Sequence, residues 1–157
     1  MKKINYDQSK FKIVIIIFGI CAISSFSFYN SYLENIKNKI INQQSIYLLE
    51  KIKIELEKCN KKKVKCFNDS LDLENIHNKE KFTSSLKIFI EKKNLLNPYK
   101  DYTEPSVIVS TSYEMLSCDN EKYNGIIISN NGIKVKIKVC FTSHISREEE
   151  FLIKEIE

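Results

Sequence analysis

Cysteines are the residues in this sequence whose chemistry is easiest to anticipate. Cys21 lies in an apolar run, Cys59 and Cys66 lie close together, and Cys118 and Cys140 lie near the C-terminus. The four cysteines outside the run form an even set, and in an exported domain such a set predicts two disulfides. Four cysteines allow three pairings, and their positions in the sequence do not choose among the three.

A zinc site is the alternative use of these four thiols. Structural zinc sites typically draw on cysteine pairs that are two to four residues apart. No two of these cysteines have that spacing, and no histidine lies beside any of them. Disulfides are therefore favoured, and the sequence predicts no metal site. Cys21 is expected to act as a small apolar residue within a bilayer.

Residues for acid–base or calcium chemistry are few. His77 and His144 are the only histidines, and each stands alone in a polar context, which is typical of a solvated side chain. Asp69, Asp72 and Glu74 could contribute to a calcium loop, but the EF-hand spacing and its glycine are missing. Phosphate loops, nucleophile elbows and zinc-protease motifs are absent too. The sequence therefore predicts neither an enzyme nor a cofactor.

Two groups of lysines could attract a polyanion such as DNA. They are Lys61, Lys62, Lys63 and Lys65, and the alternating Lys134, Lys136 and Lys138. The net charge of +5, however, comes almost wholly from lysines spread along the chain, and Arg147 is the only arginine. Lysines on an exposed strand also prevent edge-to-edge aggregation. Solvation is therefore favoured over a nucleic-acid partner.

The N-terminal part of the chain contains a long apolar segment, to which the rest of the chain is attached. Lysines dominate Met1–Lys12, and no charged residue occurs from Ile13 to Leu33. These 21 residues are enough for a helix that crosses a bilayer, which needs about 20. The lysines before the segment favour a cytoplasmic N-terminus, and Tyr29 and Tyr32 lie where an aromatic belt would meet the outer interface.

Three interpretations of this segment compete. A cleaved signal peptide would suit the basic start and the small residues Ala22, Ser24, Ser25 and Ser27. A lipoprotein signal needs a small residue before its cysteine, and Ile20 precedes Cys21. A retained anchor is favoured, because apolar residues continue at helical spacing and neither Gly nor Pro occurs between Tyr29 and Lys58. The continuing apolar residues are Leu33, Ile36, Ile40, Ile41, Tyr47, Leu48, Ile52 and Leu56. We therefore expect one unbroken helix from Ile13 to Lys58.

The rest of the chain predicts a short helix and then strands. Lys79–Lys93 places Phe82, Leu86, Phe89 and Ile90 on one helical face. Ser106–Ser112 and Gly125–Ser129 are rich in β-branched residues, and the Asn131-Gly132 pair predicts a hairpin into the alternating segment Ile133–Phe141. Ser146 and Glu149 form a capping box, so a terminal helix with Phe151, Leu152 and Ile156 on one face is expected.

With 157 residues, one domain is expected, of the α+β class, in which a long helix packs on a small antiparallel sheet. The expected parts are a basic N-terminus (1–12), a transmembrane half-helix (13–33) and an exported half-helix (34–58). A loop with a short helix (59–97) and a sheet domain with a terminal tail (98–157) follow.

Several short motifs resemble type IV pilins and type II secretion pseudopilins. In Phe18–Tyr32, FGICAISSFSFYNSY, Gly19 precedes small and apolar residues, and Tyr29 and Tyr32 mark the exit from the segment, as in that family. Asn97-Pro98-Tyr99 is similar to the NP-aromatic turn that precedes the family's sheet. Cys118 and Cys140 bracket the predicted hairpin as pilin disulfides do.

The resemblance implies a pilin-like fold and a structural subunit of a type IV filament or a type II secretion system. Its partners would be the membrane, other pilin-like subunits in a homo- or hetero-oligomer, and the assembly platform. It would sit in a bacterial inner membrane by a single pass, with its C-terminal domain periplasmic or, in a filament, extracellular. The assembly helix would use Ile13, Ile16, Ile17, Gly19, Ile20, Ile23, Phe26 and Tyr29.

The resemblance also implies a Cys118–Cys140 disulfide. We expect a second one, Cys59–Cys66, to close the basic loop NKKKVKCF. The sequence departs from the family at Asn5, Lys10 and Ser27, where the family has the processing-site glycine, a glutamate and a proline. The alternatives are therefore a non-polymerising single-pass protein with a periplasmic binding or scaffold domain, and a protein secreted after signal cleavage.

Overall fold

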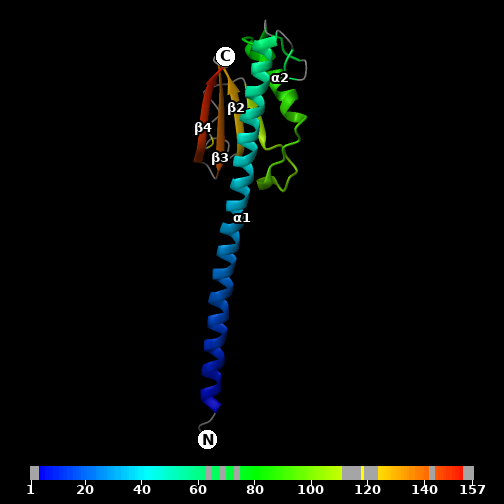
Figure 1. The fold of residues 1–157 in the computed structure, drawn as a ribbon. Helices are drawn as coiled ribbons and strands as arrows, with labels where there is room; N and C mark the ends of the chain where they lie inside the picture. The colour runs from blue at the N-terminus through cyan, green and yellow to red at the C-terminus, as the bar shows by residue number, and fades with distance from the viewer. Residues whose placement is uncertain are drawn as a thin grey trace. The chain divides into compact units, whose positions relative to one another are not determined.

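A computed structural model describes residues 4–62, 65–67, 70–72, 75–110, 118, 124–141 and 144–153. Helix α1 (Ile4–Lys62) is continuous, as the uninterrupted sequence from Tyr29 to Lys58 predicts (Figure 1). The chain divides into two units, Met1–Lys37 and Asn38–Glu157, and α1 contributes to both. The first unit is helical throughout its described part, and the second combines helices with a sheet, so the class is α+β.

The second unit contains a four-stranded sheet in the order β1-β2-β3-β4. Its strands are β1 (Val107–Ser110), β2 (Gly125–Asn130), β3 (Lys134–Phe141) and β4 (His144–Leu152). The pairs β2–β3 and β3–β4 are antiparallel, but β1 runs parallel to β2. The prediction of an antiparallel sheet is therefore wrong, because the sheet is mixed. A parallel pair needs a crossover of a dozen or more residues, and residues 111–124 provide that length.

The hairpin between β2 and β3 forms where the Asn-Gly pair predicts it. Gly132 has φ +88°, a conformation that glycine adopts without strain. The Asn131 carboxamide oxygen accepts the backbone N–H groups of Ile133 and Lys134 at 3.0 and 2.8 Å. Ile133 was expected on the apolar face of the strand, but it belongs to the turn and is 62% exposed, because β3 begins one residue later.

The prediction of a terminal helix is wrong, because residues 144–152 form strand β4. Lys136 and Lys138 of β3 face Glu150 and Glu148 of β4 in the antiparallel register. Cross-strand pairs of opposite charge stabilise a sheet, and this ladder outweighs the capping signal at Ser146. Ile156, expected on the same helix, lies outside the described residues.

One buried cluster fills the space between the helices and the inner face of the sheet. Helix α2 (Lys79–Glu91), close to the predicted 79–93, buries the four residues expected on its apolar face. Asn78 begins α2 by accepting the N–H of Lys81 at 3.1 Å, as an N-cap does. The cluster includes Ile41, Leu48, Ile52 and Leu56 from α1, Phe82, Leu86, Phe89 and Ile90 from α2, and Ile126, Ile128, Val135, Ile137 and Val139 from the sheet.

The opposite face of the sheet carries a smaller buried cluster of Cys118, Ile127 and Cys140. Side chains alternate along a strand, so Ile127 and Cys140 point away from the inner residues Ile126 and Val139. The disulfide Cys118–Cys140, with a Cα–Cα distance of 5.5 Å, joins the connection between β1 and β2 to this face. The disulfide therefore links the connection between β1 and β2 covalently to strand β3.

The Asn97-Pro98-Tyr99 turn ties the chain between α2 and the sheet to α1. Asn97 is buried, accepts the Tyr99 N–H at 2.9 Å and donates to the Asn124 carbonyl at 2.6 Å. The short 3-10 helix η2 (Pro98–Lys100) follows. The Tyr99 hydroxyl donates to the Asn38 side chain, and Gln44 Nε2 donates to the Leu96 carbonyl at 3.2 Å. Two hydrogen bonds to α1 thus fix the loop that leads into β1.

Candidate functional site

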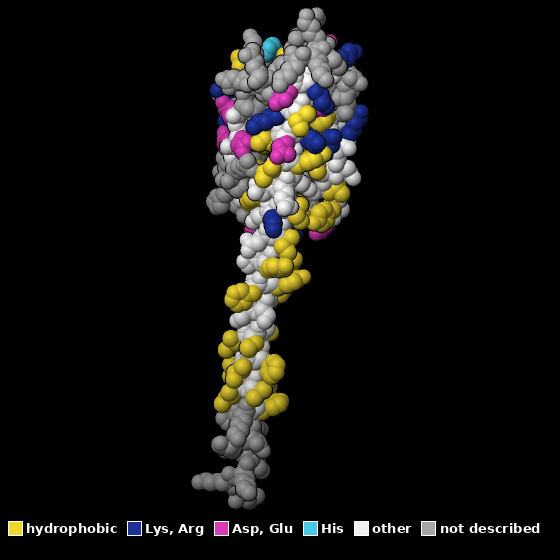
Figure 2. Space-filling view, in the orientation of Figure 1, with side chains coloured by type: hydrophobic (Ala, Val, Ile, Leu, Met, Phe, Trp, Pro, Cys, Tyr) yellow, Lys and Arg dark blue, Asp and Glu magenta, His cyan; other side chains and the backbone are white. Residues whose placement is uncertain are grey.

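The first candidate site is the surface of α1 within the first unit. Seven of the residues expected to act in assembly are between 53% and 72% exposed. These are Ile13, Ile16, Ile17, Ile20, Ile23, Phe26 and Tyr29. Figure 2 shows hydrophobic side chains gathered along this part of the helix. An exposed apolar surface of this extent marks a membrane or protein contact.

Polar groups in this segment are compatible with an apolar environment. The hydroxyls of Ser24, Ser25 and Ser27 donate to the carbonyls four residues earlier, at 2.9, 2.7 and 3.2 Å. Each hydroxyl is thus satisfied within the helix, as a bilayer requires. The helix also continues through Ser27, where the resembled family has a proline, so the backbone hydrogen bonds are retained there.

The surface of the helix has no side chain at Gly19, and the space beside this residue is open. A Cβ atom built on Gly19 would meet no atom within 4 Å other than those of its own turn of helix. Small residues let the backbone of a neighbouring helix approach closely in a membrane. Cys21, two residues on, is exposed and carries a free thiol. The described chain contains one helix that is long and apolar enough to cross a membrane.

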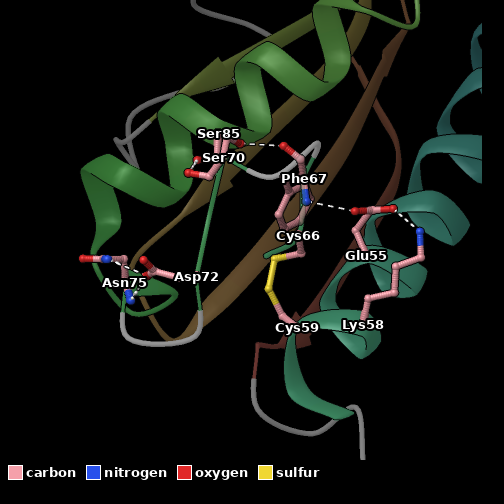
Figure 3. Close-up of a disulfide and its surroundings, with 9 residues drawn as sticks. All are labelled: Glu55, Lys58, Cys59, Cys66, Phe67, Ser70, Asp72, Asn75 and Ser85. Atoms are coloured by element: carbon pink, nitrogen blue, oxygen red, sulfur yellow. Dashed lines mark hydrogen bonds and ion pairs between the residues drawn. A yellow bond between two sulfur atoms is a disulfide. The ribbon is translucent and has the colours of Figure 1, made fainter. Parts of the chain in front are cut away.

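A second candidate site lies where α1 ends (Figure 3). The structure joins Cys59 to Cys66, with a Cα–Cα distance of 5.4 Å, and both residues are buried. Beyond the disulfide, Phe67 adopts φ +51° and packs edge-on between Phe82 and Phe89, with ring centroids 5.5 Å from each. The disulfide therefore holds the loop so that the Phe67 ring packs in the core.

Glu55 holds the same loop from the helix side. Its carboxylate accepts the backbone N–H of Phe67 at 2.8 Å and the Lys58 ammonium at 2.6 Å (Figure 3). The Ser70 hydroxyl donates to the Phe67 carbonyl at 2.5 Å, and the Ser85 hydroxyl donates to the Ser70 carbonyl at 3.1 Å. The sequence did not predict this role for Glu55, because its partner is a backbone group twelve residues away. These contacts hold the loop against α1 and α2.

Two of the residues considered for catalysis or metal binding, Asp72 and His77, have described side chains, and each interacts with a different part of the chain. Asp72 accepts the backbone N–H of Asn75 at 3.0 Å and its side-chain amide at 2.5 Å, and these hydrogen bonds, the side-chain one foremost, lower the pKa of Asp72. Nδ1 of His77 lies 3.1 Å from the Gly132 carbonyl. Within the described residues no three metal-ligating side chains gather. Asp69, Glu74 and the side chain of His144 lie outside the described part.

The lysines of β3 are compensated by β4. Lys134 Nζ lies 2.6 Å from Glu150, and Lys136 Nζ lies 2.7 Å from Glu148 and 3.8 Å from Glu150. Acidic partners at these distances reduce the field that a polyanion would meet, which favours the structural interpretation of these lysines. Lys65 is exposed, and the side chains of Lys61, Lys62 and Lys63 are not among those described.

No family model, no curated protein and no solved structure matches this chain.

Proposed function

We propose that this chain is a structural subunit, pilin-like or pseudopilin-like, of a type IV filament or a type II secretion system. The N-terminal part of α1 is held in the inner membrane before assembly, with the N-terminus cytoplasmic. It then packs against the same helix of other subunits, while the disulfide-bonded unit faces outward. The work of the protein is assembly through apolar packing, and no reaction is catalysed.

One observation carries this proposal. The apolar residues of α1 from Phe11 to Tyr32 are exposed, yet the helix continues without a break into a unit with its own buried core. An apolar surface of this kind has to be covered by lipid or by other protein, because water makes it unfavourable. The serines that bond within the helix and the open place at Gly19 fit either a bilayer or a helix bundle.

A second function is favoured by two residues in the basic N-terminal stretch. Lys10 and Asn5 stand where the resembled family has the glutamate used in assembly and the glycine of the processing site. A chain that keeps its N-terminus and does not polymerise would be a single-pass membrane protein whose exported unit binds or scaffolds an envelope complex.

Cys21 offers a direct test in native membranes, because it is the single free cysteine of the chain. The experiment moves this cysteine to each position from 18 to 25 in a Cys21→Ser background and oxidises the membranes with copper phenanthroline. Packed helices should give dimers whose yield rises and falls every three to four residues. Dimers absent at all positions, or equally weak at all, would reject assembly through packing of copies of this chain and favour the non-polymerising protein. The Cys21→Ser chain without an added cysteine is the control.

A further inference from the structure

Two of the three glycines in the sequence directly follow an asparagine. In the pair Asn124-Gly125 the glycine is the first residue of β2, whereas Asn131-Gly132 lies in the turn between β2 and β3. The nitrogen of such a glycine can attack the carboxamide carbon of the asparagine, because glycine has no side chain to hinder the approach. The chain therefore contains the same pair of reacting groups in two different backbone settings.

The turn polarises the carboxamide of Asn131. Its oxygen accepts the backbone N–H groups of Ile133 and Lys134, at 3.0 and 2.8 Å. Attack on a carbonyl carbon moves negative charge onto the oxygen, and backbone N–H groups aimed at that oxygen stabilise the charge, as an oxyanion hole does. Asn131 is also exposed, so water reaches it. The carbon that would be attacked thus already has the hydrogen bonds that favour the reaction.

The attacking nitrogen, that of Gly132, is oriented by a buried side chain. Its N–H donates to the carboxamide oxygen of Asn130 at 3.2 Å, and Asn130 Nδ2 donates to the Thr83 hydroxyl at 2.5 Å. A peptide nitrogen is a weak nucleophile, because its lone pair is delocalised into the carbonyl group. A hydrogen-bond acceptor on the N–H raises the electron density on the nitrogen, since bonded groups polarise one another. Asn130 therefore assists the attack from the side opposite the turn donors.

The other asparagine–glycine pair is held by the sheet. Gly125 pairs with Cys140 of β3, and the Asn124 carbonyl accepts Asn97 Nδ2 at 2.6 Å. Closing a ring between the two residues rotates the peptide group between them, which would break these contacts. The ladder between β2 and β3 ends at Asn130, so the same rotation in the turn breaks no strand pairing. The reaction should therefore be easier in the turn.

We propose that Asn131 is a site of spontaneous deamidation, which the turn favours over Asn124. The Gly132 nitrogen forms a bond to Cγ of Asn131 and gives its proton to water, while the carboxamide C–N bond breaks and its nitrogen takes up a proton and leaves as ammonia. Water then opens the succinimide ring at either carbonyl, which leaves aspartate or isoaspartate in the turn. The modification adds a negative charge, and it is independent of the assembly proposed for α1.

The test incubates the full chain in detergent micelles at mildly alkaline pH and follows both asparagines by peptide mass, with isoaspartate separated by chromatography. The same chain in guanidinium chloride sets the length of the incubation, because both pairs then react without folded structure. In the folded chain Asn131 should convert at least about fivefold faster than Asn124, whose reaction must first break a hydrogen bond. Asn131 that keeps its amide throughout, or equal rates at the two asparagines, would overturn the proposal.

Two variants test the turn donors separately from the lysine side chain. Lys134→Pro removes one N–H group from the Asn131 oxygen, at the first residue of a strand, where proline is tolerated. Lys134→Ala removes the same side chain and keeps the N–H group. The proline variant should deamidate at Asn131 about fivefold more slowly than the alanine variant. Equal rates would contradict the activation by the turn, and if Lys134→Pro failed to fold, the comparison of Asn131 with Asn124 in the wild type would still decide.

Discussion

The two parts of α1 use the same residue types in opposite ways. In the second unit, Ile41, Leu48, Ile52 and Leu56 are fully buried by α2 and the sheet. In the first unit, isoleucines such as Ile16 and Ile20 are each 59% exposed. The chain covers one apolar surface with its own core and leaves the other to its surroundings. Burial within the fold therefore explains the second part, whereas the first part is exposed and is long and apolar enough to cross a membrane.

The largest expected effect comes from truncating the same side chain in each part. Ile52→Ala should lower the free energy of unfolding of the second unit by about 2–5 kcal/mol, because it leaves a cavity in the core. Ile16→Ala, the matched change in the first unit, should alter the same quantity by less than about 0.5 kcal/mol. Denaturant unfolding in detergent measures both. A comparable loss for Ile16→Ala would show that this residue is already packed within the chain.

Removing the disulfides should have the next largest effect, and only in the second unit. The longer loop closed by Cys118–Cys140 predicts a loss of about 3–4 kcal/mol when both cysteines become serine, against about 2–3 kcal/mol for Cys59–Cys66. Thiol labelling of the unreduced, denatured protein should find one reactive cysteine in each chain, Cys21. Reaction at Cys118 or Cys140 would contradict their pairing.

A glycine in each part gives a smaller contrast. Gly132→Ala should destabilise the second unit by about 1–2 kcal/mol, because of its positive φ and a Cβ that would lie 2.8 Å from the His77 carbonyl oxygen. Gly19→Ala has open space and should leave the unfolding free energy unchanged. Gly19→Leu should leave it unchanged too, yet reduce Cys21 cross-linking in membranes if helices pack closely there. Equal cross-linking of the Ala and Leu variants would exclude close approach at Gly19.

The smallest effect depends on pH and belongs to the turn after the Cys59–Cys66 loop. Hydrogen bonds from Asn75 lower the pKa of Asp72 in the folded state, so the ionised form stabilises the fold. This contribution is complete above the unfolded pKa and is lost as the pH falls through the lower folded pKa. The stability difference between wild type and Asp72→Asn should therefore shrink as the pH is lowered below about 4. If the stability difference between wild type and Asp72→Asn did not change with pH, the ionised Asp72 carboxylate would not stabilise the fold.

The elements with strong local signals could be predicted from the sequence. The continuous helix follows from apolar residues without Gly or Pro after Tyr29, and the β2–β3 hairpin follows from Asn131-Gly132. β4 could not be predicted from its own residues, because Ser146 and Glu149 resemble a helix start. The alternating lysines of β3 were the available signal, because lysines opposite the glutamates of residues 148–150 would stabilise a pair of strands.

Long-range pairing explains the other differences. Nothing local to Val107–Ser110 shows that it runs parallel to β2, although the long connection between the strands permits it. Likewise, the carboxylate of Glu55 meets the backbone of Phe67 only because the loop folds back at the disulfide.

The fate of the apolar part of α1 in the cell tests the central claim most directly. Membranes from cells that produce the full chain are washed with alkaline carbonate, and the intact mass of the protein is measured in the pellet and the wash. We predict that the protein stays in the pellet with a mass that includes residues 13–33. Protein released into the wash, with a mass that begins between Ala22 and Phe28, would contradict the account.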